Sequence, residues 1–366
     1  MGQASLCGVV DLEIIAEAGT NHNGNECWGR RLIDAAAKAD ASSVKFQLIY
    51  PEGLYVPAYV DESGSYPNPV FERRAGEGLD YEAWERLNEY AVKAGIELTL
   101  SVFDSKGLNV AERLKHSYIK VASTDLNNLP FLREVASRGK RTIVSTGMST
   151  LSEVEDAVRV FDRENALERL TLLHCVSVYP CSLRLARLSR IRVLKEAFGV
   201  RVGFSDHTEG ELASSMAVAL GATVLEKHFT IDKDAPGFDH RYALDPDGLS
   251  AFVANMRASQ EACSGPVLAM SQEEAETAVR ARRGLYAARD LEPGEIISRE
   301  DVLIVRPSAF LSPKDLDSLI GCRVERRLQK YQAFRMEPEI LPGLDGHWKN
   351  AAGYWSQEMK DKGMVE

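Results

Sequence analysis

The sequence lacks the cysteine pattern of a domain held together by disulfides or by structural zinc. Its 366 residues include six cysteines, with no C-x-x-C pair and no regular spacing among them. A disulfide framework or a closed zinc site needs such spacing. We therefore expect reduced thiols and a cytoplasmic enzyme.

The sequence also lacks a long apolar run and an excess of positive charge. No apolar stretch is long enough to span a bilayer, and the opening MGQASLCGVVDLEI has neither the basic lead nor the full apolar core of a signal peptide. The formal net charge of −10 argues against a nucleic-acid-binding surface. We expect no membrane or nucleic-acid partner, although scattered lysines and arginines leave room for a local basic pocket.

What the sequence does contain is an alternation of short β-prone runs with amphipathic helical patterns. A chain of this length with 45% hydrophobic residues can bury a large core. Alternation over about 260 residues predicts a (β/α)8 barrel of the TIM type. A doubly wound open sheet is the main competitor, but no G-x-G-x-x-G follows the first run. The eight predicted strands are residues 13–19, 42–49, 96–103, 118–123, 141–146, 170–176, 200–206 and 222–229.

The pattern changes after about residue 265. Residues 1–265 form the predicted barrel, and the acidic, alanine-rich residues 266–282 are the predicted linker. Residues 283–341 have short strand-like pieces and a PG turn without a long helical period, which indicates a small β-rich domain. We have no functional interpretation of the tail, residues 342–366.

Two histidines each end a β-prone run beside acidic and hydroxyl residues. They are His207 in GFSDHTEG and His228 in LEKHFTIDKDAPGFDH. Functional side chains of a (β/α)8 barrel lie at the C-terminal ends of its strands. A single histidine there is more often a hydrogen-bonded structural residue than a ligand, but two on neighbouring strands favour a metal site.

Other strand ends carry the groups that an anion needs. Lys45 and Lys120 lie in the apolar runs VKFQLI and YIKVAS, where an unpaired ammonium is costly to bury. A salt-bridged or snorkelling lysine is the structural alternative to an anion site. Convergent hydroxyl donors would complete a phosphate site. Further polar side chains at these strand ends are Asn21, Gln47, Ser101, Asp104, Ser123, Asp125, Ser145, Thr146, Ser177 and Ser205.

Carboxylates at strand ends are candidates for proton transfer. Glu17 ends an apolar run, and an ionised buried carboxylate needs a partner. Glu226 precedes His228 by two residues, so both side chains point to one face of a strand. His174 and Tyr179 are weaker candidates, because a core imidazole and a packed loop tyrosine explain them equally well.

The motifs AEAGTNHNG, VKFQ, STGMST, LLHC, GFSDHT and LEKHFTIDKDAPGFDH, followed by RRGLYAARDLEPGE, resemble the N-acetylneuraminate (sialic acid) synthase family. The resemblance extends from about residue 12 to 341. It implies a (β/α)8 barrel joined to a small SAF domain, which is similar to type III antifreeze protein. It also implies a domain-swapped homodimer in which the small domain covers the partner's barrel mouth.

The resemblance implies a reaction as well. Phosphoenolpyruvate would condense with the open-chain aldehyde of an N-acylated amino sugar, giving a nine-carbon 2-keto acid and phosphate. His207 and His228 match ligands of a divalent ion, Mn2+ or Mg2+, while Glu17 and Glu226 match carboxylates near the reacting carbons. Matches to the phosphoenolpyruvate site are Lys45, Gln47, Lys120, Ser123, Ser145 and Ser205. Matches to the sugar site, or departures at its positions, are Asp125, Ser177, Tyr179, Asp239 and Arg306.

The sequence departs from the family pattern around the sugar. It reads Ser123-Thr124-Asp125 where many members have SGE, Ser177 where many have Asn, and PGFDH where PGPDH is usual. Legionaminic and pseudaminic acid synthases and spore-coat polysaccharide relatives share most of the motifs, so the acceptor sugar stays open. A metal-dependent barrel hydrolase or aldolase and an inactive carbohydrate-binding protein are the other classes considered.

Overall fold

The computed structural model describes residues 11–264 and 269–335. The chain divides into two compact units, residues 1–265 and residues 266–366. The predicted tail, the last six residues of the predicted small domain and the first three of the predicted linker lie outside the described residues. Each unit is described by itself.

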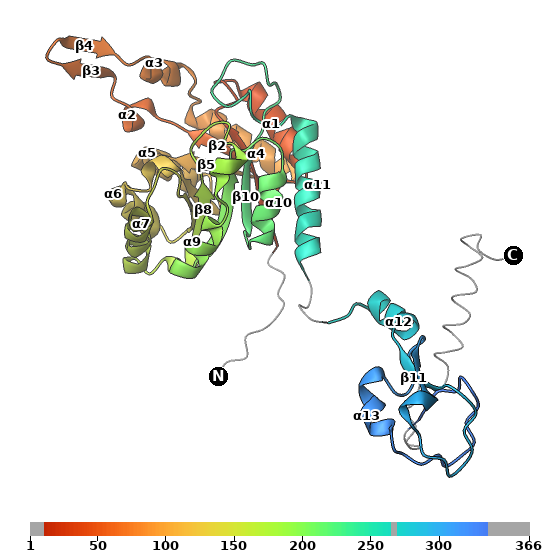
Figure 1. Ribbon diagram of the computed structural model, residues 1–366. Helices are drawn as coiled ribbons and strands as arrows, with labels where there is room; N and C mark the ends of the chain where they lie inside the picture. Colours follow the sequence, from red (N-terminus) through yellow and green to blue (C-terminus); the bar gives the residue numbers. More distant parts are fainter. Residues whose placement is uncertain (1–10, 265–268, 336–366) are drawn as a thin grey trace. The chain divides into compact units, whose positions relative to one another are not determined.

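The first unit is a closed barrel of eight parallel strands, which confirms the predicted (β/α)8 fold and excludes an open sheet (Figure 1). Each strand overlaps one of the eight predicted runs. Their order around the barrel is β1, β10, β9, β8, β7, β6, β5 and β2. The strands are β1 (Glu13–Gly19), β2 (Ser43–Leu48), β5 (Glu97–Val102), β6 (Tyr118–Val121), β7 (Arg141–Ser145), β8 (Leu170–Cys175), β9 (Arg201–Asp206) and β10 (Val224–His228).

Helices cover the outside of the barrel, and side-chain caps fix where several of them begin. Asp80 accepts a hydrogen bond from the Ala83 amide and Asp245 from the Gly248 amide, each satisfying an amide that has no partner within its helix. The outer helices are α1 (Glu26–Lys38), α4 (Tyr81–Ala94), α5 (Ser105–Arg113), α6 (Leu129–Ser137), α7 (Leu151–Arg163), α9 (Arg190–Phe198), α10 (Leu212–Ala219) and α11 (Pro246–Cys263). Shorter pieces are η1 (Ser123–Asp125), η2 (Leu167–Arg169) and α8 (Leu183–Ala186).

An excursion that the sequence analysis did not predict follows β2. It consists of α2 (Pro51–Leu54), the hairpin of β3 (Ala58–Asp61) and β4 (Gly64–Pro67), and α3 (Pro69–Gly76). Figure 1 shows the hairpin projecting away from the barrel strands. Buried Asn68 joins its two ends, since it donates to the Val56 carbonyl at 2.8 Å and accepts from the Val70 amide at 3.0 Å.

Two apolar layers hold the barrel. The larger lies between the strands and the helices around them. The smaller is a layer of apolar side chains inside the barrel, below the charged residues described later, and we call it the barrel floor. It consists of Ile15, Tyr118, Ile143, Leu173 and Val224. Because side chains alternate along a strand, the residues two positions further on also point inward and lie one layer above this floor.

The second unit is small and contains an antiparallel pair of strands. It comprises α12 (Gln272–Ala281), β11 (Gly284–Ala287), η3 (Arg299–Asp301), β12 (Val302–Val305), η4 (Pro313–Asp315) and α13 (Leu316–Leu319). Its own apolar cluster includes Leu285, Leu291, Val302 and Phe334. Across residues 11–264 and 269–335, no helix combines the length and apolar character that crossing a bilayer would require.

Candidate active site

Four buried ionisable groups meet in the layer directly above the barrel floor. Glu17, Lys45, Lys120 and Glu226 come from β1, β2, β6 and β10, and each is at most 5% exposed. Lys45 and Glu17 form an ion pair. The Glu226 Oε2 atom lies 3.5 Å from the Lys45 ammonium and 3.8 Å from that of Lys120.

Hydroxyl groups surround these charges. The Lys45 ammonium donates to Ser101 Oγ at 2.7 Å, and the Lys120 ammonium donates to Ser145 Oγ at 2.8 Å. Ser205 donates from its hydroxyl to Glu226 Oε1 at 2.8 Å. Glu226 Oε2 has no hydrogen bond of its own within the part of the chain that the structure describes. The site therefore combines two cations with several small donors, which suits a multiply charged anion.

The two carboxylates differ in the proton affinity that their surroundings impose. Burial raises the pKa of Glu17, and the neighbouring charge of Glu226 adds to the rise, although Lys45 opposes it. Burial would also raise the pKa of Glu226, but the ammonium groups of Lys120 and Lys45 and the Ser205 hydrogen bond outweigh it and lower that pKa. One carboxyl group thus holds a proton readily while the other stays ionised, as acid–base chemistry requires.

His207 and His228 lie beside one another at the ends of β9 and β10, with ring centroids 5.5 Å apart. The His207 Nδ1 atom lies 2.8 Å from the Val176 carbonyl, which makes Nδ1–H the donor and leaves Nε2 free to act as a ligand. His228 is buried, and its Nδ1 lies 3.9 Å from Asp239 Oδ2. These two imidazoles could together hold a divalent cation that keeps open coordination positions.

The described residues offer no fuller metal cage. Among them, no group of three or more His, Cys, Asp or Glu side chains is arranged to hold a metal ion. A cation on the two histidines would therefore take its remaining ligands from water or substrate, as in a site that binds and polarises a reactant.

Aromatic rings and Asp239 form the rim above the histidines. The Tyr179 ring lies 4.0 Å from the His207 ring and 5.4 Å from the Tyr242 ring. Tyr242 donates its hydroxyl to Asp239 Oδ1 at 2.7 Å. Gly19 has φ +54°, and a Cβ there would lie 3.0 Å from Asp239 Oδ2, so glycine allows the close approach of Asp239 to β1.

Other predicted residues contact their own neighbours around the mouth. Gln47 donates to Glu17 Oε1 at 3.4 Å, and Ser123 Oγ accepts from the Gly147 amide at 2.9 Å. A Cβ on Gly147 would lie 2.3 Å from Ser177 Oγ, which places both serines against this glycine. Polar side chains thus continue from the layer above the barrel floor up to the ends of the strands.

Of the remaining predicted site residues, one lies in the first unit and one in the second. Asp125 accepts hydrogen bonds from its neighbours Thr124 and Asn128 at 2.9 and 3.2 Å. Arg306 is exposed and lies in the second unit, after β12. His174 is a core residue, because its Nε2 lies 2.6 Å from the Ala186 carbonyl and its ring stacks on Phe204.

Sequence reasoning missed two residues of the mouth. Cys175 is buried with its Sγ 3.9 Å from His207 Nδ1, and Tyr242 contacts both Tyr179 and Asp239. Strand alternation would have found Cys175, since it lies two residues after Leu173 of the barrel floor. No local signal marks Tyr242, which lies in the loop after β10.

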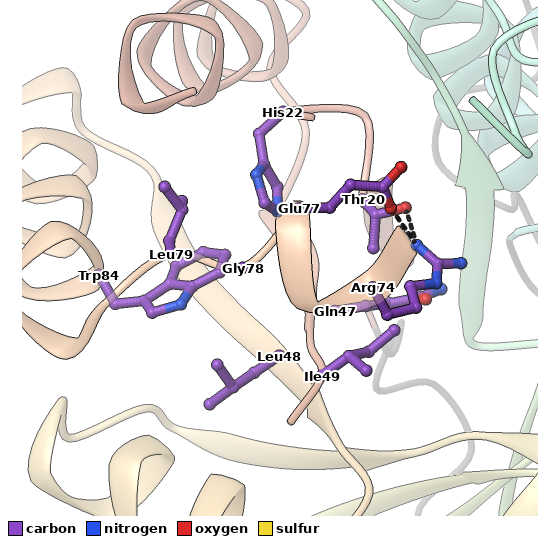
Figure 2. A pocket seen from close by; sticks show the side chains of 10 residues that line it. All are labelled: Thr20, His22, Gln47, Leu48, Ile49, Arg74, Glu77, Gly78, Leu79 and Trp84. Atoms are coloured by element: carbon purple, nitrogen blue, oxygen red, sulfur yellow. Dashed lines mark hydrogen bonds and ion pairs between the residues drawn. The ribbon is translucent and has the colours of Figure 1, made fainter. Parts of the chain in front are cut away.

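A small cavity of about 20 Å3 lies beside Gln47, between the β1 and β2 loops and the segment from α3 to α4 (Figure 2). Three buried nitrogen atoms among its lining residues have no hydrogen-bond partner within residues 11–264 and 269–335: His22 Nε2, Trp84 Nε1 and Arg74 Nε. A polar cavity of this size has room for about one water molecule.

The family assignment rests on two stretches that together make up most of the chain. Residues 32–267 match the model of the NeuB family, and residues 282–333 match the SAF domain. The chain belongs to the NeuB family. This confirms the resemblance to sialic acid synthases and the predicted SAF domain.

Relatives with named activities are similar over most of their length. The chain is 33% identical to an N,N'-diacetyllegionaminic acid synthase of Legionella pneumophila, over 86% of this chain and 91% of the relative. It is 35% identical to a pseudaminic acid synthase of Campylobacter jejuni, over 86% and 93%. A crystal structure of the N-acetylneuraminic acid synthetase of Leptospira borgpetersenii matches with a TM-score of 0.67 and 30% identity, over 76% of this chain and 94% of that one.

Proposed function

We propose that this NeuB-family protein is a synthase that condenses phosphoenolpyruvate with an N-acylated amino sugar aldehyde to give a nonulosonic acid and phosphate. The observation that carries the proposal is the buried cluster of two lysines, two glutamates and several hydroxyls above the barrel floor. Relatives named as synthases of three different nonulosonic acids support the class of product.

Lys45 and Lys120 are the proposed cradle for phosphoenolpyruvate. Both are buried, and both already donate to serine hydroxyls, so their ammonium groups are held in place before a ligand arrives. Two cations near an anion that carries a phosphate and a carboxylate offset its charge where water is excluded. Ser123, Ser145 and Ser205 supply the shorter-range donors of the same cradle.

Glu17 and Glu226 are the proposed proton-transfer and orienting groups. In the reaction a carbon–carbon bond forms between the methylene carbon of phosphoenolpyruvate and the aldehyde carbon. Water then adds to the former enol carbon, and the carbon–oxygen bond to phosphate breaks. The raised pKa of Glu17 lets it hold or release a proton near neutral pH, whereas Glu226 stays anionic beside the site of developing positive charge.

His207 and His228 are the proposed ligands of a divalent cation, Mn2+ or Mg2+, which when bound polarises the aldehyde oxygen as a Lewis acid. The free Nε2 of His207 and the pairing of the two rings support this assignment. Tyr179 and Asp239 at the rim are the proposed contacts of the sugar. A homodimer whose SAF domain brings Arg306 to the partner's sugar site is part of the same proposal.

The decisive experiment is a product screen with the full chain. Phosphoenolpyruvate and a panel of N-acyl hexosamines, including diacetamido and phosphorylated sugars, should yield inorganic phosphate and a nine-carbon acid detected by mass spectrometry. A metal-dependent aldolase or hydrolase would instead need no phosphoenolpyruvate and release no phosphate. Failure of every sugar to release phosphate would end the proposal.

The metal assignment has its own measurement. Calorimetric titration of chelator-treated protein with Mn2+ should show one site, and His207→Ala should abolish binding and metal-dependent turnover while leaving the fold intact. His116→Leu is the matched control, because His116 is a buried histidine between α5 and β6. Equal Mn2+ binding by the wild type and His207→Ala would remove His207 from the metal site.

A further inference from the structure

We propose that Phe238, gripped by Arg73 and Arg74 of α3, is a positioning residue that sets the place of Asp239 and hence the affinity for the acceptor sugar. This rests on the proposed function, because it assigns Asp239 to the sugar. The contact joins the excursion after β2 to the loop after β10, two segments more than 160 residues apart in sequence.

The two arginines present their guanidinium groups to one aromatic ring. The Cζ atoms of Arg73 and Arg74 lie 4.3 and 4.7 Å from the centroid of the Phe238 ring. Both distances are within the range of a cation–π contact. Phe238 is 50% exposed, so burial in the core does not hold its ring in place, whereas the two guanidinium groups lie against it.

Arg74 is itself fixed by the barrel. Its Nη1 donates to Thr20 Oγ1 at 2.8 Å and to Glu77 Oε2 at 3.0 Å, as Figure 2 shows. The other carboxylate oxygen of Glu77 accepts from Arg73 Nε at 2.7 Å. One carboxylate thus orients both guanidinium groups, and Thr20 ties that of Arg74 to the segment just after β1.

Asp239 directly follows Phe238 and is held from the other side. Tyr242 donates to it at 2.7 Å, and His240 is anchored by Thr230, whose Oγ1 lies 2.7 Å from His240 Nδ1. Gly237 has no room for a side chain, because a Cβ would lie 2.3 Å from His240 Cδ2. The contact of Phe238 with the two arginines, which we call the clamp, attaches the residue before Asp239 to α3.

The chain has Phe238 in PGFDH, where the sequence analysis noted that PGPDH is usual, and the aromatic ring is what makes the contact possible. A proline would stiffen the backbone at this position but would offer no aromatic face to the arginines. In this chain the position of Asp239 is instead coupled to α3, so a change in α3 reaches the sugar site.

The test compares Phe238→Leu with Phe238→Trp. Leucine removes the π face and tryptophan keeps it. Loss of the π face that both arginines contact is expected to raise the KM of the acceptor sugar about fivefold to tenfold in Phe238→Leu, with Phe238→Trp within about twofold of wild type. The KM of phosphoenolpyruvate and the melting temperature should not change. Arg73→Met, combined with Phe238→Leu, should add nothing further.

A second readout does not depend on turnover. Amide hydrogen exchange of residues 232–243 in the substrate-free protein should accelerate in Phe238→Leu and not in Phe238→Trp. Tyr90→Leu is the control, because it removes another arginine–aromatic contact, Arg30 over Tyr90 at 5.2 Å, between the outer helices α1 and α4. It should leave both readouts unchanged.

The outcomes separate the two proposals. If no sugar is turned over by the wild type, the proposed function fails, while the exchange measurement still reports on the clamp. Equal behaviour of the leucine and tryptophan variants in exchange and in KM would overturn the clamp. A parallel rise in the KM of phosphoenolpyruvate would overturn its link to the sugar.

Discussion

Strand β10 contributes to two buried lysine–carboxylate clusters, one on each of its faces. On the outer face, Lys227 donates to Asp206 at 2.9 Å, and Asp206 also accepts from the Thr208 amide and the Ser214 hydroxyl. Both of its carboxylate oxygens are therefore hydrogen-bonded. On the inner face, Glu226 faces two ammonium groups at 3.5 and 3.8 Å, and its Oε2 makes no hydrogen bond to the described part of the chain.

The two carboxylates differ in whether all their hydrogen bonds are made, and this distinguishes a structural ion pair from a candidate ligand site. A buried charged group whose hydrogen bonds are all made within the protein needs no ligand to satisfy it. A buried cluster with spare capacity costs stability unless something fills it, and such groups gather at functional sites. Neighbouring residues on one strand, Glu226 and Lys227, thus serve different purposes because alternation sends them to opposite faces.

The largest effect is expected on the inner face. Lys120→Met removes one of the two cations from the proposed anion cradle, and the rate of phosphate release should fall by about 10²- to 10³-fold. Stability should change little, because the variant also removes the cost of burying an ammonium. Steady-state kinetics and thermal melting measure the two quantities. Activity close to wild type would show that Lys120 is only a structural partner of Ser145.

On the outer face the effect should be on stability instead. Lys227→Met leaves the Asp206 carboxylate buried without its cation, and this should lower the free energy of unfolding by about 3–5 kcal/mol. Urea denaturation measures the loss. The kcat of the folded variant should match wild type. A large fall in kcat without a stability loss would reverse the roles assigned to the two faces.

His116 tests whether a buried polar group without hydrogen bonds is by itself a sign of a functional site. It is buried away from the mouth, and neither ring nitrogen has a hydrogen-bond partner in the described chain. Burial, with the nearby charge of Lys140, lowers its pKa from 6.5 to about 4. Below pH 6.5 the unfolded chain binds a proton that the folded chain does not, so stability falls as the pH drops from 6.5 towards 4.

The wild type should lose up to about 3 kcal/mol over that interval through His116, and His116→Leu should lose correspondingly less. Urea midpoints at pH 7, 5.5 and 4.5 measure the difference. Catalytic activity at pH 7 should be unaffected. An inactive but folded His116→Leu protein would mean that the comparison of satisfied and unsatisfied groups misses a functional contribution.

The smallest effect is expected when the outer pair is replaced as a whole. In the double variant Asp206→Leu and Lys227→Met no isolated charge remains, and exchanging a buried ion pair for apolar side chains is often neutral. We expect a change in the free energy of unfolding of about 1 kcal/mol, smaller than for Lys227→Met alone. A loss as large as that of the single variant would mean that the Thr208 and Ser214 bonds dominate.

Much of the barrel and its mouth could be predicted because both follow from local patterns. A β-prone run ending in polar residues fixes where a strand ends, and the period of two fixes which side chains share a face. This suffices to bring Lys45, Glu17 and Glu226 together from three separate strands. It also explains why His174 turned out to be a core residue, since it alternates with inward-facing Leu173 and Cys175.

The contacts between loops could not be predicted in this way. Arg73 and Arg74 lie on a short helix whose sequence, PVFERRAG, is typical of a surface helix. Nothing near them in sequence indicates a contact with Phe238. Their meeting depends on where the excursion after β2 folds back against the barrel, which no periodicity encodes. Tyr242 was missed for the same reason. The rim that is proposed to select the sugar is therefore harder to predict than the charged layer below it.

The outer pair of Asp206 and Lys227 has a consequence for how the barrel assembles. If β10 paired with its neighbours one residue out of step, Glu226 would face the helices and Lys227 the interior. The Asp206 carboxylate would then lose its cation, and the Lys227 ammonium would leave the Phe252 ring, whose centroid lies 5.9 Å from it in the native fold. The lysine on the far side of the strand thus makes a slipped alignment costly, and in doing so keeps His228 pointing into the mouth.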